Sequence, residues 1–194
     1  MEELQAIIDG SRVFYFDWEL DLLHWFQNIH NTFLDFIVPK ITSLGNGGWF
    51  WIAITLLLIF IPSKRKWGFQ AVFSIIITVI ICNLILKPLI MRCRPCWLEP
   101  DVPLLVKIPK DYSFPSGHSN ISFAVATAIF TRNKKIGIPA LVLAALIAIS
   151  RLYVFVHWPT DVLVGTIIGI CGGISSFYII NFLYTKFSKK VDMN

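Results

Sequence analysis

Two histidines and one carboxylate in this sequence have the types and spacing that nucleophilic chemistry needs. Asp161 follows His157 by four residues, close enough to orient its imidazole ring by a hydrogen bond. A histidine oriented by a carboxylate is an activated nucleophile or general base. The second histidine, His118, is then free to protonate a leaving group. Pro159 lies between His157 and Asp161 and suits the first turn of a helix.

Three cations and a predicted helix start accompany these histidines and are suited to binding a phosphate. A phosphate carries close to two negative charges and accepts several hydrogen bonds, so it matches fixed Lys and Arg side chains. The segment Pro115-Ser116-Gly117-His118 directly precedes an apolar run, where backbone N–H groups and the helix dipole would face an anion. The candidate phosphate ligands are Lys87, Arg94, Ser116, Gly117 and Arg151.

Composition places these residues in a membrane protein. Of the 194 residues, 56% are hydrophobic and 15% are charged, whereas an ordinary soluble domain is about a quarter charged. Disorder is excluded, because disordered segments combine low hydrophobicity with high net charge. The net charge of +5 comes largely from short basic clusters beside apolar runs, which are typical of cytoplasmic loops. The basic charge therefore indicates membrane topology, and no nucleic-acid partner is expected.

Five charge-poor stretches predict an all-α, polytopic membrane helix bundle with five spans. A bilayer is crossed by about 20 apolar residues, and the stretches are 41–62, 67–86, 119–131 (extending back to 112), 136–156 and 162–185. One alternating topology results if the cytoplasm contains the basic clusters at 64–66, 132–135 and 186–190. All the candidate site residues then lie at the outer face.

The first 40 residues carry the pattern of an amphipathic helix. Polar residues recur at spacings of three and four from Asp21 to Asp35, opposite an apolar stripe from Leu22 to Ile37. This pattern predicts a helix lying on the bilayer, since a sixth span, the alternative, would bury Asp35 at a cost. No signal peptide is expected, because no basic region precedes an apolar run with a cleavage site. The expected units are an interfacial segment (1–40), a membrane domain (41–187) and a basic cytoplasmic tail (188–194).

Three ordered signatures resemble the type-2 phosphatidic acid phosphatase family. In the first, six residues separate Lys87 from the Arg94-Pro95 pair. The second is Pro115-Ser116-Gly117-His118, and the third runs from Ser150-Arg151 through His157 to Asp161. The ordered set is far more specific than any one motif, and the resemblance covers about residues 45 to 185.

The resemblance implies a metal-independent lipid phosphatase that needs no cofactor. His157 would attack phosphorus and form a phosphohistidine while Asp161 holds its ring, and His118 would protonate the departing oxygen. The phosphoryl oxygens would be bound by Lys87, Arg94, Ser116, Gly117 and Arg151. Nothing in the chain resembles an acidic Mg²⁺ cage, which agrees with charge stabilisation by fixed cations.

A site at bilayer depth on the outer face of the plasma membrane predicts a lipid phosphate as substrate. Undecaprenyl pyrophosphate is the leading candidate; phosphatidylglycerophosphate, phosphatidic acid and lipid A are the alternatives. Gly117 counts against undecaprenyl pyrophosphate as the substrate, since some dedicated undecaprenyl pyrophosphate enzymes of the family have Asp at this position. A phosphotransferase and a non-catalytic lipid-binding or transport protein are the other hypotheses. The sequence predicts no oligomeric state.

Several other polar residues have modest expected roles. Asn83 could support the site or only pack, and a disulfide between Cys93 and Cys96 is an alternative to two free thiols. Buried, small apolar roles are expected for Cys82 and Cys171. No chemistry is expected of the remaining candidates: His24 and His30, and the solvated charges Arg92, Lys107 and Lys110.

Overall fold

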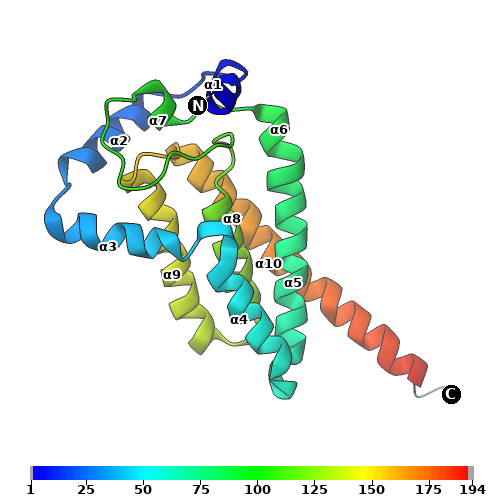
Figure 1. Cartoon of the computed structure of the whole chain (residues 1–194). Helices are drawn as coiled ribbons and strands as arrows, with labels where there is room; N and C mark the ends of the chain where they lie inside the picture. The colour runs from blue at the N-terminus through cyan, green and yellow to red at the C-terminus, as the bar shows by residue number, and fades with distance from the viewer. Residues whose placement is uncertain (1, 192–194) are drawn as a thin grey trace.

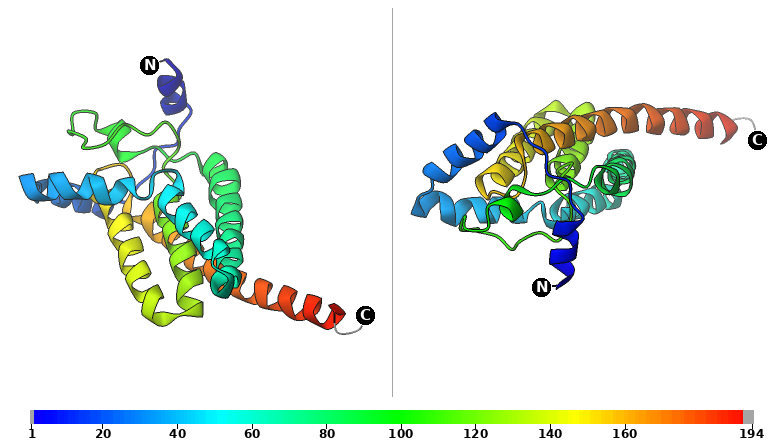
Figure 2. Two further views of the ribbon diagram at one scale, coloured as in Figure 1. Left: turned by 60° about the horizontal axis from the view of Figure 1, so that its bottom comes forward. Right: turned by 90° about the horizontal axis from the view of Figure 1, so that it is seen from above.

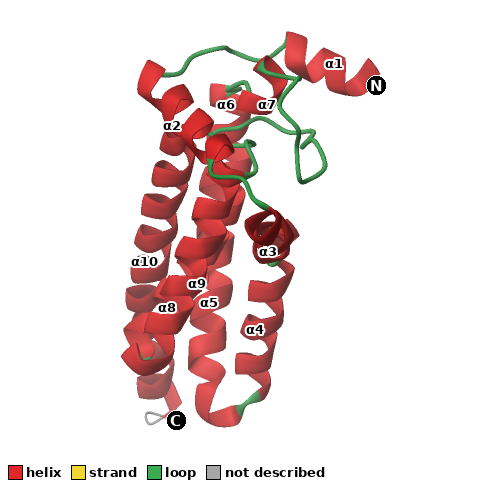
Figure 3. Ribbon diagram, turned by 90° about the vertical axis from the view of Figure 1, so that its left-hand side faces the viewer, coloured by secondary structure: helices red, strands yellow, loops and turns green. Residues whose placement is uncertain are grey.

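Helices joined by loops make up residues 2–191, the part of the chain that this computed structural model describes (Figures 1 and 3). No strand occurs within this range, so the predicted all-α class is confirmed. Two short 3-10 turns, η1 (Asn46–Gly48) and η2 (Pro62–Lys64), and one π-helix, η3 (Ile80–Leu86), interrupt the α-helices. The α-helices are α1 (Glu2–Asp9), α2 (Asp17–Asn28), α3 (Thr32–Ser43), α4 (Trp49–Phe60), α5 (Arg65–Val79), α6 (Lys87–Ile90), α7 (Pro95–Leu98), α8 (Gly117–Arg132), α9 (Lys134–Tyr153) and α10 (Pro159–Val191).

Helix α8 lies at the centre of the bundle and packs against α5, α9 and α10. Glycines on α10 allow a close approach, as small residues do in membrane helix pairs. A Cβ atom on Gly169 would lie 2.5 Å from the backbone oxygen of Asn120, and one on Gly165 would lie 2.6 Å from that of Ser116. The second contact holds the start of α8 directly against α10.

Three helical segments are long and apolar enough to cross a membrane: Pro62–Ile90, Lys134–Tyr153 and Pro159–Lys186. Helix α3 and the 46–60 segment add a fourth if they count as one span, although they meet at 45°. Helix α8 has 16 residues, fewer than the roughly 20 that cross a bilayer. The structure therefore confirms a multi-pass helix bundle but does not confirm the count of five spans.

Large apolar side chains face outward along the bundle, as expected of a surface in contact with lipid. Phe60 is 78% exposed, Leu84 67% and Leu163 57%. Cys82 is fully buried, as predicted, but Cys171 is exposed on α10, so the predicted burial of Cys171 is wrong. A helix surrounded by lipid can direct a small apolar residue outward at little cost, so hydropathy alone did not distinguish these two positions.

The predicted amphipathic helix near the N-terminus is two helices, so its predicted continuity is wrong. The break lies between α2 and α3, where the side chain of Asn31 accepts hydrogen bonds from the backbone N–H groups of Phe33 and Leu34, at 3.1 and 3.0 Å. An Asn in this position caps a new helix start. Helix α3 runs across the bundle axis (Figures 1 and 2), and its Phe33 and Phe36 are exposed. This orientation suits a segment on the membrane surface, which stays a prediction.

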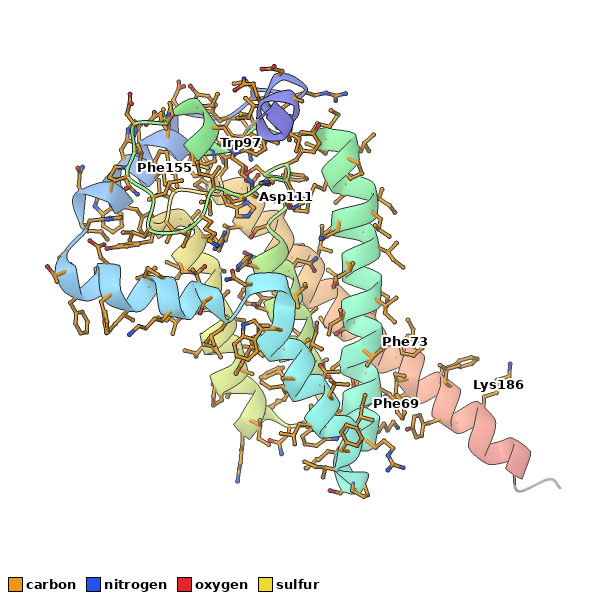
Figure 4. All side chains as sticks on the ribbon, in the orientation of Figure 1. Phe69, Phe73, Trp97, Asp111, Phe155 and Lys186 are labelled. Atoms are coloured by element: carbon orange, nitrogen blue, oxygen red, sulfur yellow. The ribbon has the colours of Figure 1, made fainter. Side chains whose placement is uncertain are left out.

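The basic clusters lie toward the end of the bundle opposite α2 and α3. The α4–α5 and α8–α9 turns both lie at that end (Figure 1), and Lys186 lies on the part of α10 that extends toward it (Figure 4). Of the predicted tail 188–194, residues 192–194 lie outside the described residues. The separation of the two ends is the geometry that the predicted topology requires.

Candidate active site

The predicted site residues come from separated segments that meet at the end of the bundle near α2 and α3. They surround a cavity of about 240 Å³. Six of the eight line it: Lys87, Arg94, Gly117, His118, Arg151 and His157. The other two, Ser116 and Asp161, are buried behind the wall, where the backbone N–H of Ser116 donates to the backbone oxygen of Asp161 at 3.0 Å.

Ser116, which was predicted to be a phosphate ligand, does not line the cavity. Its hydroxyl oxygen accepts from the backbone N–H of Ser119 at 3.4 Å and from the Ser119 hydroxyl at 3.0 Å, as an N-cap does. Gly117 follows as the first residue of α8, and a Cβ atom added there would meet no other atom within 4 Å. The backbone of Gly117 is therefore open to the cavity, whereas the Ser116 side chain holds the helix start.

The π-helix η3 positions the first cation. A π-helical turn shifts the side chains that follow it, and such turns are frequent at functional sites. Lys87, which begins α6 directly after η3, and Asn83 within η3 both line the cavity. Of the two roles expected for Asn83, this placement favours support of the site over packing alone.

His157 is 2% exposed, and its two ring nitrogens have different partners. Nδ1 lies 3.4 Å from Oδ2 of Asp161, and Nε2 lies 3.2 Å from a terminal nitrogen of Arg94. Because a guanidinium only donates hydrogen bonds, Nε2 must present its lone pair and Nδ1 must carry the proton. Burial first, and then the charges of Arg94 and Arg151, lower the pKa of His157 well below its usual range. The ring is thus neutral at neutral pH.

Asp161 is held from several sides. Its Oδ2 accepts from the backbone N–H of Trp158 at 2.9 Å and from the hydroxyl of Ser113. The Ser113 hydroxyl also lies 3.5 Å from Nδ1 of His157. The Oδ1 atom of Asp161 accepts from Arg92 at 2.6 Å. The carboxylate cannot turn away from His157 without breaking these contacts, so its orientation is fixed.

Asp111, which was not among the predicted site residues, pairs with two of the predicted phosphate ligands. Its carboxylate contacts the Nζ atom of Lys87 and accepts from Arg94 at 2.7 Å. Burial raises the pKa of Asp111, but the opposing effects of Arg94 and Lys87 are together larger and leave it well below its usual range. Figure 4 shows Asp111 in the loop at the site end. No motif marks this residue, so only its place in the structure reveals it.

Arg151 differs from the other two cations because the partner of its side chain is neutral. It is 5% exposed and donates from a terminal nitrogen to the hydroxyl of Thr42, on α3, at 2.6 Å. Its Nε atom is buried and has no hydrogen-bond partner among the described residues. A buried, unsatisfied guanidinium donor is costly, so part of the hydrogen-bonding capacity of Arg151 is left unused by the described residues.

His118 lies across the cavity and is packed against the α3–α4 connection. Its Nε2 lies 3.0 Å from Oδ1 of Asn46. Gly45 leaves room for the ring, because a Cβ atom there would lie 2.4 Å from Cδ2 of His118. His118 and Arg151 also line a second, larger cavity of about 610 Å³ between α3 and residues 105–109, with Lys107 at its edge.

Arg92 was predicted to be a solvated charge, and that prediction is wrong. The side chain is 2% exposed and pairs with Asp161 and with Glu19 of α2, which is also fully buried. Charged residues are almost never fully buried unless paired, but Glu19 lies 73 residues away from Arg92 in the chain. No local pattern could therefore reveal the pair.

The remaining polar residues lie outside this cavity. Cys93 and Cys96 are buried free thiols, so the disulfide alternative is wrong, and burial raises the pKa of Cys96 to about 11. His24 and His30 line a separate cleft beside α2. Within residues 2–191, no group of three His, Cys, Asp or Glu side chains is placed to hold a metal ion.

Fold and cavity together define the class: a multi-pass helical membrane protein with a cation-lined site that contains two histidines. The chain belongs to the PAP2 superfamily, whose family model matches residues 67–184. The family is the one that the three signatures predicted.

Relatives of known name have related activities. The chain is 37% identical over 120 residues to an undecaprenyl-diphosphatase of Sulfolobus acidocaldarius, across 61% of this chain and 58% of that protein. It is 30% identical to the undecaprenyl-diphosphatase BcrC of Bacillus subtilis, across 82% and 77%. Among solved structures, Aquifex aeolicus LpxE matches with a TM-score of 0.75 and 31% identity, over 84% of this chain and 96% of that one.

Proposed function

We propose that this protein hydrolyses a phosphate from a lipid phosphate or diphosphate, most simply undecaprenyl pyrophosphate, through a phosphohistidine at His157. The observation that carries the proposal is the cavity itself, in which a neutral, buried imidazole stands beside Lys87, Arg94 and Arg151. The lone pair on Nε2 accepts from Arg94 in this structure. A phosphate that takes over the Arg94 guanidinium would free this lone pair for in-line attack on phosphorus.

The first step forms one bond and breaks one. Nε2 of His157 donates its lone pair to phosphorus, and the bond between phosphorus and the leaving oxygen breaks. The imidazole becomes positively charged, and Asp161 stabilises that charge across the contact with Nδ1. The cations and the Gly117 backbone N–H hold the equatorial oxygens, where charge develops in the transition state.

His118 is the proposed general acid. It lines both cavities, so it stands between the phosphoryl group and the space that receives the leaving group. It gives a proton to the departing oxygen and then takes one from water, which attacks the phosphohistidine and releases phosphate. For a diphosphate substrate the leaving group is the lipid monophosphate, and the 610 Å³ cavity gives it room beside Arg151.

The reaction is proposed to occur at the extracytoplasmic face of the plasma membrane. Support comes from the basic turns, which lie at the opposite end of the bundle and favour the cytoplasm. The site then faces the outer leaflet, where a lipid phosphate can enter from the side. Five spans, with α8 as a short third one, remain the proposed topology.

The substrate choice is supported by the relatives named undecaprenyl-diphosphatase. A lipid A 4'-phosphatase of Bacteroides thetaiotaomicron, 29% identical over 86% of this chain and 78% of that protein, keeps a monophosphate substrate as the alternative. Phosphate release by the detergent-purified protein in EDTA, from undecaprenyl pyrophosphate, phosphatidylglycerophosphate, phosphatidic acid and lipid A, separates them.

Two histidine variants serve as controls. His157→Ala should lose all release, whereas His24→Ala, which changes a histidine of the separate cleft, should keep it. Release by His157→Ala at the wild-type rate would refute the nucleophile. Absence of release from every lipid would instead favour phosphotransfer or lipid transport on the same fold.

A further inference from the structure

Arg92 and Glu19 form a buried network that joins the N-terminal segment to Asp161. One terminal nitrogen of Arg92 donates to Oδ1 of Asp161 at 2.6 Å and to the Thr160 hydroxyl at 2.7 Å. The other donates to Oε2 of Glu19 at 2.7 Å. Both charged side chains are almost completely buried. Burying such charged groups costs free energy of desolvation, which is offset only when each group has its hydrogen-bonding and charged partners.

Glu19 also holds the start of the helix that carries Asp161. Its Oε1 accepts from the backbone N–H of Thr160 at 3.0 Å and from the Thr160 hydroxyl at 2.6 Å. A carboxylate is favourable at this position, because the N-terminus of a helix carries partial positive charge. Glu19 therefore reaches α10 both directly and through Arg92.

The backbone on either side of Arg92 is tied to the same N-terminal segment. The N–H of Arg12 donates to the oxygen of Met91 at 2.8 Å, and the N–H of Cys93 donates to the oxygen of Arg12 at 2.9 Å. The Nε atom of Arg92 donates to the backbone oxygen of Phe14 at 3.0 Å. The position of the guanidinium is thus set by residues 12–19.

We propose that Glu19 and Arg92 are positioning residues for the phosphoryl-transfer step, a role that rests on the proposed phosphohistidine reaction. The two oxygens of Asp161 have different partners: Oδ1 accepts from Arg92, and Oδ2 faces His157. As the bond from Nε2 to phosphorus forms, His157 becomes positively charged and needs Asp161 ionised and fixed. The contact with Arg92 fixes that carboxylate and favours its ionised form, and Glu19 balances the charge of Arg92, so that the three groups together leave one negative charge beside His157.

This role makes the N-terminal segment part of the catalytic unit and not only a membrane anchor. A purely structural pair would change stability but leave the chemistry of the folded enzyme alone. The pH dependence distinguishes the two, since charged groups from several elements surround His157. These are Asp161, Arg94, Arg151, Lys87 and Asp111. Arg92 pairs with Asp161, and Glu19 pairs with Arg92. A change at Glu19 or Arg92 should therefore move the acid limb of the pH–rate profile, which is the pH range in which kcat falls as the solution becomes more acidic.

The test compares Glu19→Gln with Arg92→Gln and the conservative Arg92→Lys. Asp35→Asn is the matched control, because Asp35 is an acid of the same N-terminal segment that pairs with His30 and Tyr153, away from the cavity. For Glu19→Gln we expect kcat to fall about tenfold or more with little change in KM, as when a reacting group is misplaced. Arg92→Lys should restore part of the activity that Arg92→Gln loses, and it serves as the second variant if Glu19→Gln does not fold.

The direction in which the acid limb moves follows from the sign of the charge that is removed. Glu19→Gln removes a negative charge and leaves Arg92 uncompensated. Protonation of His157 then becomes less favourable, so the acid limb should move to lower pH. Arg92→Gln removes a positive charge, so the limb should move to higher pH. Asp35→Asn should leave the limb where it is in the wild-type protein.

A binding measurement separates the two proposals without turnover. Orthovanadate accepts a bond from a nitrogen lone pair, whereas inorganic phosphate uses only the cations, so the wild-type protein should prefer vanadate. Glu19→Gln should lower this preference about tenfold, and Asp35→Asn should not. If Glu19→Gln keeps wild-type kcat, pH profile and vanadate preference, or if Asp35→Asn loses them equally, the positioning role is overturned while the proposed function stands. A wild-type protein that neither releases phosphate nor prefers vanadate overturns the phosphohistidine reaction, and the positioning role with it.

Discussion

Replacing Asp111 by Asn should make the site bind inorganic phosphate more tightly. Asp111 contacts both Lys87 and Arg94, so a phosphate that enters must take these two cations from the carboxylate. The carboxylate would return to these cations as phosphate leaves, and we expect Asp111 to assist release of the product in this way. Asparagine has nearly the same shape but no charge, and its oxygen would compete weakly.

The size of this effect follows from the exposure of the Asp111 carboxylate, since Lys87 and Arg94 are themselves buried. The Asp111 side chain is 54% exposed, so water screens its attraction to the cations. An exposed ion pair contributes about 0.2–1 kcal/mol, and two pairs give about 0.4–2 kcal/mol, or a roughly two- to thirtyfold lower inhibition constant for phosphate. Because the pKa of Asp111 lies well below its usual range, the effect should persist at about pH 4, where an ordinary aspartate is half protonated.

The assay is inhibition of lipid dephosphorylation by added inorganic phosphate, with Asp101→Asn as the control. Asp101 is an exposed acid of the same outer loop that lines a different cleft. We expect stronger inhibition in Asp111→Asn and no change in Asp101→Asn. Weaker inhibition in Asp111→Asn would show that Asp111 holds the cations in place for phosphate. Equal changes in both variants would show that the effect comes from the net charge of the loop and not from the contacts of Asp111.

Three further predictions test the histidines and their support. Asp161→Asn should lower kcat by up to ~10⁴-fold, as in other carboxylate-oriented histidine systems; a loss below about tenfold would leave Asp161 only a helix-start role. Gly45→Ala should lower kcat by displacing His118, since the added Cβ would lie 2.4 Å from that ring while the φ of −86° at Gly45 adds no backbone strain. Gly47→Ala, where an added Cβ meets nothing within 4 Å but φ is +57°, should lower stability without displacing His118. The free energy of unfolding should decrease as pH falls below about 6.5, because unfolded His157 takes up a proton that the folded ring refuses. Thermal unfolding of His157→Ala should show a smaller decrease, and equal slopes would contradict the buried neutral ring.

The sequence predicted the part of this site whose chemistry is local. His157 and Asp161 lie four residues apart across a helix start, so their contact follows from spacing, and the cations lie at the ends of recognisable apolar runs. Hydropathy likewise predicted helices near residues 67–86, 136–156 and 162–185, which the structure contains with somewhat different ends. The break at Asn31 could not be predicted in this way, because the helical spacing continues through it and only the capping hydrogen bonds reveal the new start.

The site residues that could not be predicted from the sequence are those that balance the charge of the predicted ones. Asp111 lies in a loop without a motif, and Glu19 and Arg92 are separated by most of the N-terminal segment and two helices of the bundle. Their pairing depends on the fold that brings α2 over the start of α10. A spacing rule cannot reveal such a pair, because the two partners belong to no common periodic element.

The charge balance of the folded site also assigns different tasks to its cations. Lys87 and Arg94 contact Asp111, and Arg92 contacts Glu19 and Asp161, so these cations are compensated before any phosphate arrives. Arg151 donates to the neutral hydroxyl of Thr42 and keeps its buried Nε without a partner among the described residues. An entering phosphate would therefore meet its least compensated cation at Arg151, on the wall shared with the larger cavity, before it displaces Asp111 from the other two. Since a buried charge attracts most strongly where no fixed counter-charge opposes it, Arg151 would set the first contact and Asp111 would set the release.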